Sequence, residues 1–192
     1  MATQTRIGAP ESATGGLYAA PRGTALPTDA ATALDTKFKA LSLIGEDGLS
    51  ETENRSTEEV RAWGGSLARV LQTEYGIQVS FTFLTRDIEV LKRIYGAENV
   101  TVDTSAEGKT KISVKRNAKP LPRESYIAEI KDGPNHKLRL VYPDAQITEI
   151  GDVTYSHNSL IQFEVTLACY EDESGTSGYQ YEEFTGTGAS AA

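Results

Sequence analysis

Apolar and polar residues alternate with a period of two along much of this chain, which indicates half-buried β-strands. The clearest stretch is 76–84, where apolar side chains recur at every second position from Ile77 to Phe83. A second stretch, 161–169, has five apolar residues at alternate positions, from Ile161 to Cys169. We expect these faces to point into a core.

Shorter alternating stretches follow the same pattern through the second half of the chain. They lie at 100–102, 112–114, 126–130, 138–142 and 147–150, and turn residues stand at 107–108 and 132–133. Several short strands with turns at such spacing are typical of a β-sandwich or β-barrel. The sequence therefore predicts a mainly β fold.

One α-helix is predicted at about residues 86–95. Thr85 is a suitable N-cap, and the apolar residues Ile88, Leu91 and Ile94 fall on one face of the helix. Gly96 supplies the residue type at which helices commonly end.

The ends of the chain lack a clear period. Residues 1–35 contain Pro21 and Pro27 and predict an irregular N-terminal arm, although Leu17, Tyr18 and Leu26 offer apolar anchors. A strand at 37–44 and a tight turn at 45–48 lead into a β-rich domain over 36–170. The composition of residues 171–192 predicts an acidic C-terminal tail. Part of this tail is expected to dock on the domain through Tyr179, Tyr181 and Phe184.

The segment 46–59 is polar and predicts either a long solvated loop or an extended hairpin tip. It is followed by 60–72, where the pair Gly64-Gly65 disfavours a helix and favours a strand with a glycine bulge. Trp63 is expected in a core or an interface. The candidate contacts between subunits are the three arm anchors and the charged residues of this segment: Leu17, Tyr18, Leu26, Glu46, Asp47, Glu51, Glu53, Arg55, Glu58 and Glu59.

Composition limits the partners that this protein can have. The 192 residues carry a formal net charge of −8, and no lysine or arginine follows Arg139. Duplex DNA affinity comes largely from cations that neutralise phosphates, so we expect no tight DNA binding. There is no apolar run long enough for a membrane span, and the N-terminal segment lacks the apolar region of a secretory signal.

The sequence contains few residues that are candidates for a catalytic or metal-binding site. The single cysteine, Cys169, falls on the apolar face of a strand, and both His136 and His157 are expected to be solvated. Glu46 and Asp47, with Asp35 nearby, do not have the spacing of a calcium-binding loop. We therefore predict no catalytic residue, no metal site and no cofactor.

Several segments together resemble the major tail tube protein of long, non-contractile-tailed bacteriophages, especially those of actinobacterial hosts. They are GGLYAAPRGTALPTD, ALSLIGEDGLSE, STEEVRAWGG and FTFLTRDIEVLKRIYG, in this order and spacing. The resemblance implies a sandwich- or barrel-like fold with one flanking helix, and hexameric rings that continue the sheet between subunits. It also implies a tube stacked from these rings in the virion, built in the host cytoplasm around a tape measure protein. Tail terminator and distal tail proteins are then further partners, and DNA passes through the lumen without tight binding.

Three alternatives stay open at this point. The first is a small β-barrel hydrolase or isomerase that uses His157 with a nearby acid. The second is a monomeric β-sandwich binding module, such as a receptor-binding or capsid-decoration domain. The third is a secretion-system tube protein of the same fold.

Overall fold

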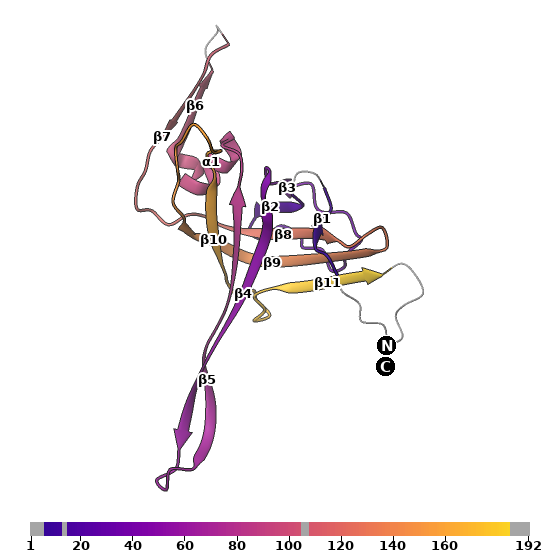
Figure 1. Ribbon diagram of the computed structural model, residues 1–192, viewed down its shortest axis with the longest axis vertical. Helices are drawn as coiled ribbons and strands as arrows, with labels where there is room; N and C mark the ends of the chain where they lie inside the picture. The colour runs from indigo at the N-terminus through magenta and orange to yellow at the C-terminus, as the bar shows by residue number, and fades with distance from the viewer. Residues whose placement is uncertain (1–5, 13–14, 105–107, 185–192) are drawn as a thin grey trace.

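A computed structural model describes residues 6–12, 15–104 and 108–184 of the chain (Figure 1). In these ranges the protein is built mainly of β-strands with one α-helix, as the hydrophobic pattern predicts. The elements in chain order are β1 (Ala9–Pro10), β2 (Leu17–Pro21), β3 (Lys39–Ala40), β4 (Ile44–Arg61), β5 (Leu67–Phe83), α1 (Ile88–Tyr95), the 3₁₀ turn η1 (Ala97–Asn99), β6 (Val100–Thr104), β7 (Thr110–Val114), β8 (Arg123–Lys131), β9 (His136–Ile150), β10 (Phe163–Cys169) and β11 (Tyr179–Phe184).

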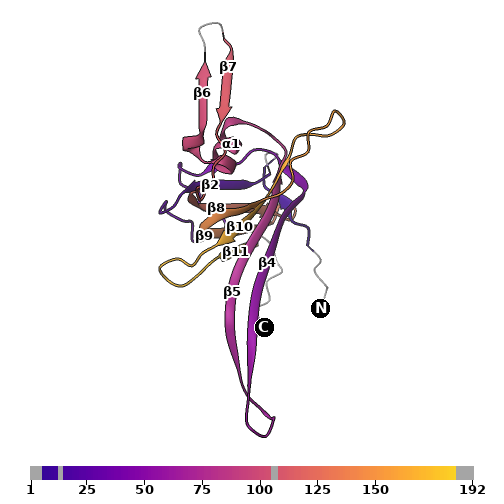
Figure 2. The same cartoon turned by 90° about the vertical axis from the view of Figure 1, so that its left-hand side faces the viewer.

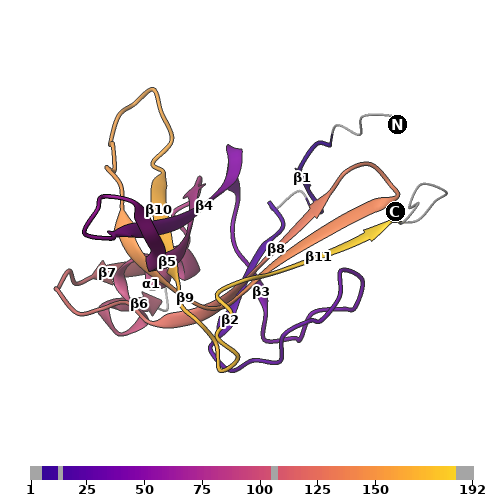
Figure 3. The same cartoon turned by 90° about the horizontal axis from the view of Figure 1, so that it is seen from below.

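Strand β9 organises the main sheet. The strand order is β3-β2-β8-β9-β10-β5-β4, all antiparallel, while β1 adds to β8 and β11 adds to β9. The first half of β9 pairs with β11 and the second half pairs with β10. Seen from below, β8, β9 and β11 extend together to one side, away from β10 and α1 (Figure 3).

The core lies where α1 covers the β5–β10 part of this sheet. Phe81 and Phe83 of β5 stand edge to face with ring centroids 5.0 Å apart, and Phe163 of β10 is fully buried. Leu91 and Ile94 bring the apolar face of α1 into the same cluster. The alternating residues of 76–84 and 163–169 therefore point inward as their period predicts. Ile161 precedes β10 and is only partly buried.

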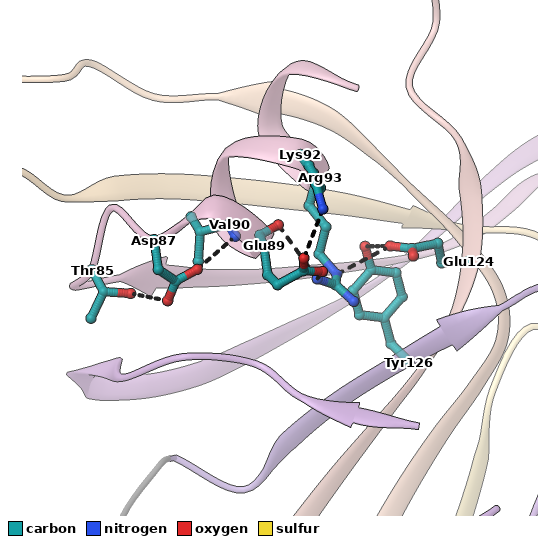
Figure 4. A network of polar contacts seen from close by, with 8 residues as sticks. All are labelled: Thr85, Asp87, Glu89, Val90, Lys92, Arg93, Glu124 and Tyr126. Carbon is teal, nitrogen blue, oxygen red and sulfur yellow. Dashed lines mark hydrogen bonds and ion pairs between the residues drawn. The ribbon is translucent and has the colours of Figure 1, made fainter. Parts of the chain in front are cut away.

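The helix begins two residues later than its sequence suggests. Asp87, not Thr85, is the N-cap, since its Oδ1 accepts from the Val90 backbone N–H at 2.9 Å (Figure 4). Thr85 instead donates from its hydroxyl to Asp87 Oδ2 at 3.1 Å. Gly96 ends the helix with φ 87°, a left-handed conformation that favours glycine.

An ion pair fastens the helix to the sheet. Arg93 Nε lies 3.4 Å from Glu124 of β8, whose carboxylate also accepts from the Tyr126 hydroxyl at 3.2 Å (Figure 4). Burial raises the pKa of Glu124, an effect that the Arg93 charge only partly offsets.

The prediction of an irregular arm over residues 1–35 is wrong for Leu17–Pro21. This segment is strand β2, which pairs with β8 from Leu17↔Ala128 to Pro21↔Glu124. Its small residues Ala19 and Ala20 are buried, so the strand fits tightly into the sheet despite the nearby prolines. The predicted strand at 37–44 shrinks to Lys39–Ala40, and residues 1–5 of the arm lie outside the described ranges.

The polar segment 46–59 is not a loop. It belongs to β4, which pairs with β5 along almost its whole length. The predicted glycine bulge at Gly64-Gly65 is also wrong, because these residues form the turn of the β4–β5 hairpin, where Gly65 has φ 83°.

The segment 171–192 is only partly a tail. Tyr179–Phe184 forms β11, so the three aromatic residues expected to dock do lie on the sheet. Residues 185–192 lie outside the described ranges, as does Glu107 of the predicted turn before β7. In the described part of the chain, no helix is long and apolar enough to cross a membrane.

Candidate assembly surfaces

The outer half of the β4–β5 hairpin, which we call the ribbon (residues 54–76), projects far from the rest of the protein (Figures 1 and 2). Strand β10 pairs with β5 only over Ile77–Phe83, so the residues from Leu67 to Gly76 have β4 as their one partner strand among the described residues. Ten residues of strand span roughly 30 Å. An isolated two-stranded ribbon is marginally stable in water, which favours a partner surface for it.

The ribbon exposes an unusual number of large apolar side chains. Trp63 stands at the hairpin turn and is 106% exposed relative to a reference residue. The turn itself is closed by backbone hydrogen bonds from Ala62 to Ser66 and from Gly65 to Ala62. The strands beside it expose Val60, Leu67, Val70, Leu71 and Tyr75. Exposed apolar surface of this kind marks interaction sites.

Acidic residues lie beside these apolar groups. Glu58 is the cross-strand partner of Leu71, and Glu59 is the partner of Val70. Adjacent residues of a strand face opposite sides, so each face of the ribbon carries one glutamate next to one aliphatic residue. Both faces are therefore suited to contact a protein surface.

An arginine stiffens the middle of the ribbon. Arg55 pairs with Glu53 at 2.6 Å, and its guanidinium lies 4.6 Å from the centre of the Tyr75 ring. The hydrogen bond from Arg55 lowers the pKa of the Glu53 carboxyl. A second pair, Arg61–Glu59, holds the strand near the turn.

The inner end of the hairpin is anchored in the sheet. Tyr142 of β9 is buried and donates from its hydroxyl to Glu51 of β4 at 2.5 Å. Burial raises the pKa of this phenol, and the neighbouring Glu51 carboxylate raises it further. The direction in which the ribbon leaves the sheet is thus fixed by a contact from the centre of the fold.

The arm anchors serve their own subunit. Leu17 is 3% exposed and belongs to the main core, which leaves it little surface for a neighbour. Tyr18 and Leu26 are half-buried against a second cluster around Phe38 and Ile127. The apolar pattern was correct in predicting that these residues pack against other residues, and the contact of Tyr18 and Leu26 with a neighbouring subunit stays a prediction.

The other candidate residues are exposed and lie on one strand. Glu46 and Asp47 sit near the start of β4 and line a groove with Ile130 of β8. Glu51, Glu53, Arg55, Glu58 and Glu59 follow along β4. Sequence reasoning left open whether Trp63 lies in a core or an interface, and the structure excludes the subunit's own core. It missed the anchor Tyr142. The long polar run before Gly64-Gly65 was the available signal for an extended hairpin.

The cysteine and His157 show no sign of a catalytic site. Burial raises the pKa of the Cys169 thiol to about 12, which disfavours the thiolate, and His157 lies exposed in a bend. Within the described ranges, no group of three or more His, Cys, Asp or Glu residues is placed to hold a metal ion.

Comparison with known proteins assigns the fold to a family. The family model described as "Phage tail tube protein" matches residues 8–183. The chain belongs to the phage tail tube protein family. The resemblance found in the sequence is thereby confirmed, and the protein is a structural component of phage tails.

Two solved structures are similar over most of their length. One is the cap of the anti-feeding prophage, described as its tube-terminating cap, with 10% identity, a TM-score of 0.47 and coverage of 94% of this chain and 93% of that chain. The other is a chain from the virion of a native gene transfer agent particle, with 17% identity, a TM-score of 0.38 and coverage of 80% and 92%. Both scores are too low to add to the assignment. No curated protein matches the chain.

Proposed function

We propose that this tail tube protein assembles into hexameric rings that stack into a tube, and that the tube conducts the phage genome during delivery. The observation that carries the proposal is the ribbon, which holds Trp63 and other apolar side chains in water far from the subunit's own core. A contact with a subunit of the next ring removes that surface from water. Burial of apolar surface is the main driving force of most protein association.

Ring closure has its own physical basis. Strand β4 pairs with β5 alone and β3 pairs with β2 alone among the described strands, so both ends of the sheet order offer unpaired backbone groups. Such edges invite pairing with another chain. A head-to-tail contact between unlike edges closes into a ring when the rotation allows it, and it satisfies the exposed backbone groups.

The remaining parts of the proposal follow from the family. Self-association provides the tube, while a tape measure protein and the terminator and distal tail proteins are partners that such a tube requires. The protein acts as a structural element of the virion, not as an enzyme, and it is made in the host cytoplasm. DNA passes through the lumen without a dedicated binding site.

The proposal is tested by shortening the ribbon. Thr57 and Gln72 are cross-strand partners, so residues 58–71 can be replaced by Asn-Gly, a sequence that favours a two-residue hairpin turn. Circular dichroism and thermal unfolding should show a folded subunit, since the removed residues are exposed. Negative-stain microscopy of concentrated protein should show hollow tubes for the wild type and none for the variant. Monomeric wild-type protein across a wide range of concentration and salt would refute self-assembly and favour a binding or decoration module.

A further inference from the structure

The residues before β1 reach across the end of the sheet to its last strand. Strand β1 pairs with the end of β8, whereas β11 pairs with the first half of β9. Seen from below, β1 and β11 lie on either side of the β8–β9 hairpin (Figure 3). Arg6 contacts both His136, the first residue of β9, and Phe184 of β11. We call Arg6, His136, Glu182 and Phe184 the latch.

The His136 ring lies at the centre of the latch. Its side chain is only 11% exposed, so the prediction of a solvated histidine is wrong for this residue. The ring stacks on Phe184, with centroids 4.7 Å apart and an angle of 21° between the planes. The guanidinium carbon of Arg6 lies 4.3 Å from the centre of the same Phe184 ring. A guanidinium and an imidazole thus share one aromatic ring of β11.

The hydrogen bond between Arg6 and His136 fixes the protonation state of the imidazole. Arg6 Nη1 lies 2.6 Å from His136 Nε2. A guanidinium stays charged and can only donate, so Nε2 is the acceptor and the proton of the neutral ring lies on Nδ1. Nδ1 is buried and has no hydrogen-bond partner among the described residues. A proton added at Nε2 removes the acceptor and places a second cation against Arg6.

The carboxylate of Glu182 faces both groups. It lies 3.7 Å from His136 Nε2 and 3.8 Å from Arg6 Nη1. The other charged residues on the strands and turn around the ring are Glu11, Lys131, Asp132, Lys137 and Glu183. Lys137 is held by Glu11 at 2.9 Å. A protonated His136 therefore keeps Phe184 and gains the charge of Glu182, while Arg6 loses its acceptor and meets a like charge.

We propose that the latch is a proton-sensitive switch, which holds the N-terminal residues on β11 while His136 is neutral and releases Arg6 when His136 takes up a proton. Histidine is the side chain that ordinarily changes charge between pH 5 and 8. The contact is thus present above the pH at which His136 titrates and is lost below it. The release ends at β1, because the Glu11 backbone N–H donates to the Glu129 carbonyl at 3.0 Å. The switch acts within one subunit and does not depend on the proposed assembly.

A fixed charge at position 136 tests the switch at a single pH. Trypsin cleaves after arginine, and cleavage of a segment that opens locally follows the population of its open form. At neutral pH, H136K should release the peptide of residues 1–6 at least about tenfold faster than the wild type, as measured by mass spectrometry. H136Q should release it at the wild-type rate, because its amide oxygen is a neutral acceptor for Arg6. The matched control is H157K, which adds the same charge at a histidine exposed in a bend and should behave as the wild type.

Nitrogen NMR provides a second test on the wild-type subunit. At neutral pH the proton of the His136 ring should lie on Nδ1. As the pH falls through about 8 to 5, backbone ¹⁵N relaxation should show greater picosecond-to-nanosecond mobility at residues 6–8 in the wild type and no such change in H136Q. Equal cleavage of H136K and H136Q would overturn the switch, because loss of packing and not charge would then release Arg6. A neutral ring protonated on Nε2, or the same mobility change in H136Q, would also overturn it.

Discussion

Tyr142 and Glu51 join the centre of the fold to its most exposed element. The hydroxyl of Tyr142 on β9 donates to the Glu51 carboxylate at 2.5 Å, at the point where β4 starts to leave the sheet. The donor is buried and the acceptor is exposed, so the bond lies at the boundary between core and ribbon. A rigid anchor at this point sets where the far end of the ribbon can reach.

Replacing Tyr142 with phenylalanine should therefore disturb assembly more than folding. The variant keeps the ring in the core but removes the donor, at a cost of about 1 kcal/mol in the free energy of unfolding. Tube formation should require a higher protein concentration, measured by light scattering. Tyr95→Phe is the control, because its hydroxyl accepts only from the exposed Arg116, at 3.3 Å, among the described residues. Equal effects of both variants on assembly would show that the anchor is unimportant.

Gly16 tests whether the N-terminal region belongs to the body of the subunit. Its φ is +63°, and a Cβ there would lie 2.4 Å from the Glu129 carbonyl oxygen. Gly16→Ala should lower the free energy of unfolding by at least about 2 kcal/mol, because backbone strain and a backbone clash add together. Gly23→Ala has similar strain, with φ +85°, but meets no atom within 4 Å. It should cost only about 1 kcal/mol by denaturant unfolding, and equal losses would contradict this packing.

The segment before β11 should be sensitive to acid. Asp172 accepts hydrogen bonds from the Tyr179 hydroxyl, Ser174 and the Thr176 backbone N–H, and these bonds lower the pKa of its carboxyl below the ordinary 3.8. A group with a depressed folded-state pKa stabilises the fold above its unfolded pKa and loses this effect as the pH falls. Hydrogen exchange of the β11 amides should thus accelerate below about pH 4 relative to the rest of the sheet.

The variant Asp172→Asn distinguishes the contribution of Asp172 to this acid sensitivity from that of the other acidic residues. In the variant, β11 amides should exchange faster at neutral pH, and the extra acceleration below pH 4 should be reduced. A wild-type profile in the variant would show that Asp172 does not hold this segment.

Duplex DNA should bind weakly to the subunit. The chain has a net charge of −8 and has no lysine or arginine after residue 139. In a mobility-shift assay at near-physiological salt, no saturable submicromolar complex should form. Saturable binding lost in K111E/K115E would instead identify β7 as a nucleic-acid surface.

The sequence predicted the regular interior better than the projections. Burial on one face imposes a strict alternation, so the inward positions from Ile77 to Phe83 and the helix face of Leu91 and Ile94 could be predicted directly. The ribbon has no buried face, and its strands therefore carry little periodic signal. Its pairing is set by the turn at Gly64-Gly65 and by cross-strand contacts such as Arg55 with Tyr75.

The prediction of an irregular N-terminal arm failed for a different reason. Proline and glycine in residues 15–27 weaken every local pattern, yet β8 offers an edge on which Leu17–Pro21 can pair. This strand forms because it pairs with β8, about a hundred residues away in the chain. The local sequence carries no signal for such a distant partner. Leu17, which the sequence proposed as a contact between subunits, packs in the core of its own subunit.

Electron cryomicroscopy of the assembled protein tests the central claim most directly. A reconstruction at side-chain resolution should show a hollow tube of stacked rings. Trp63 should be buried against a subunit of an adjacent ring, and the ribbon should be covered along its length. A tube whose ribbons stand free in solvent, with Trp63 as exposed as it is in the single subunit, would contradict the account.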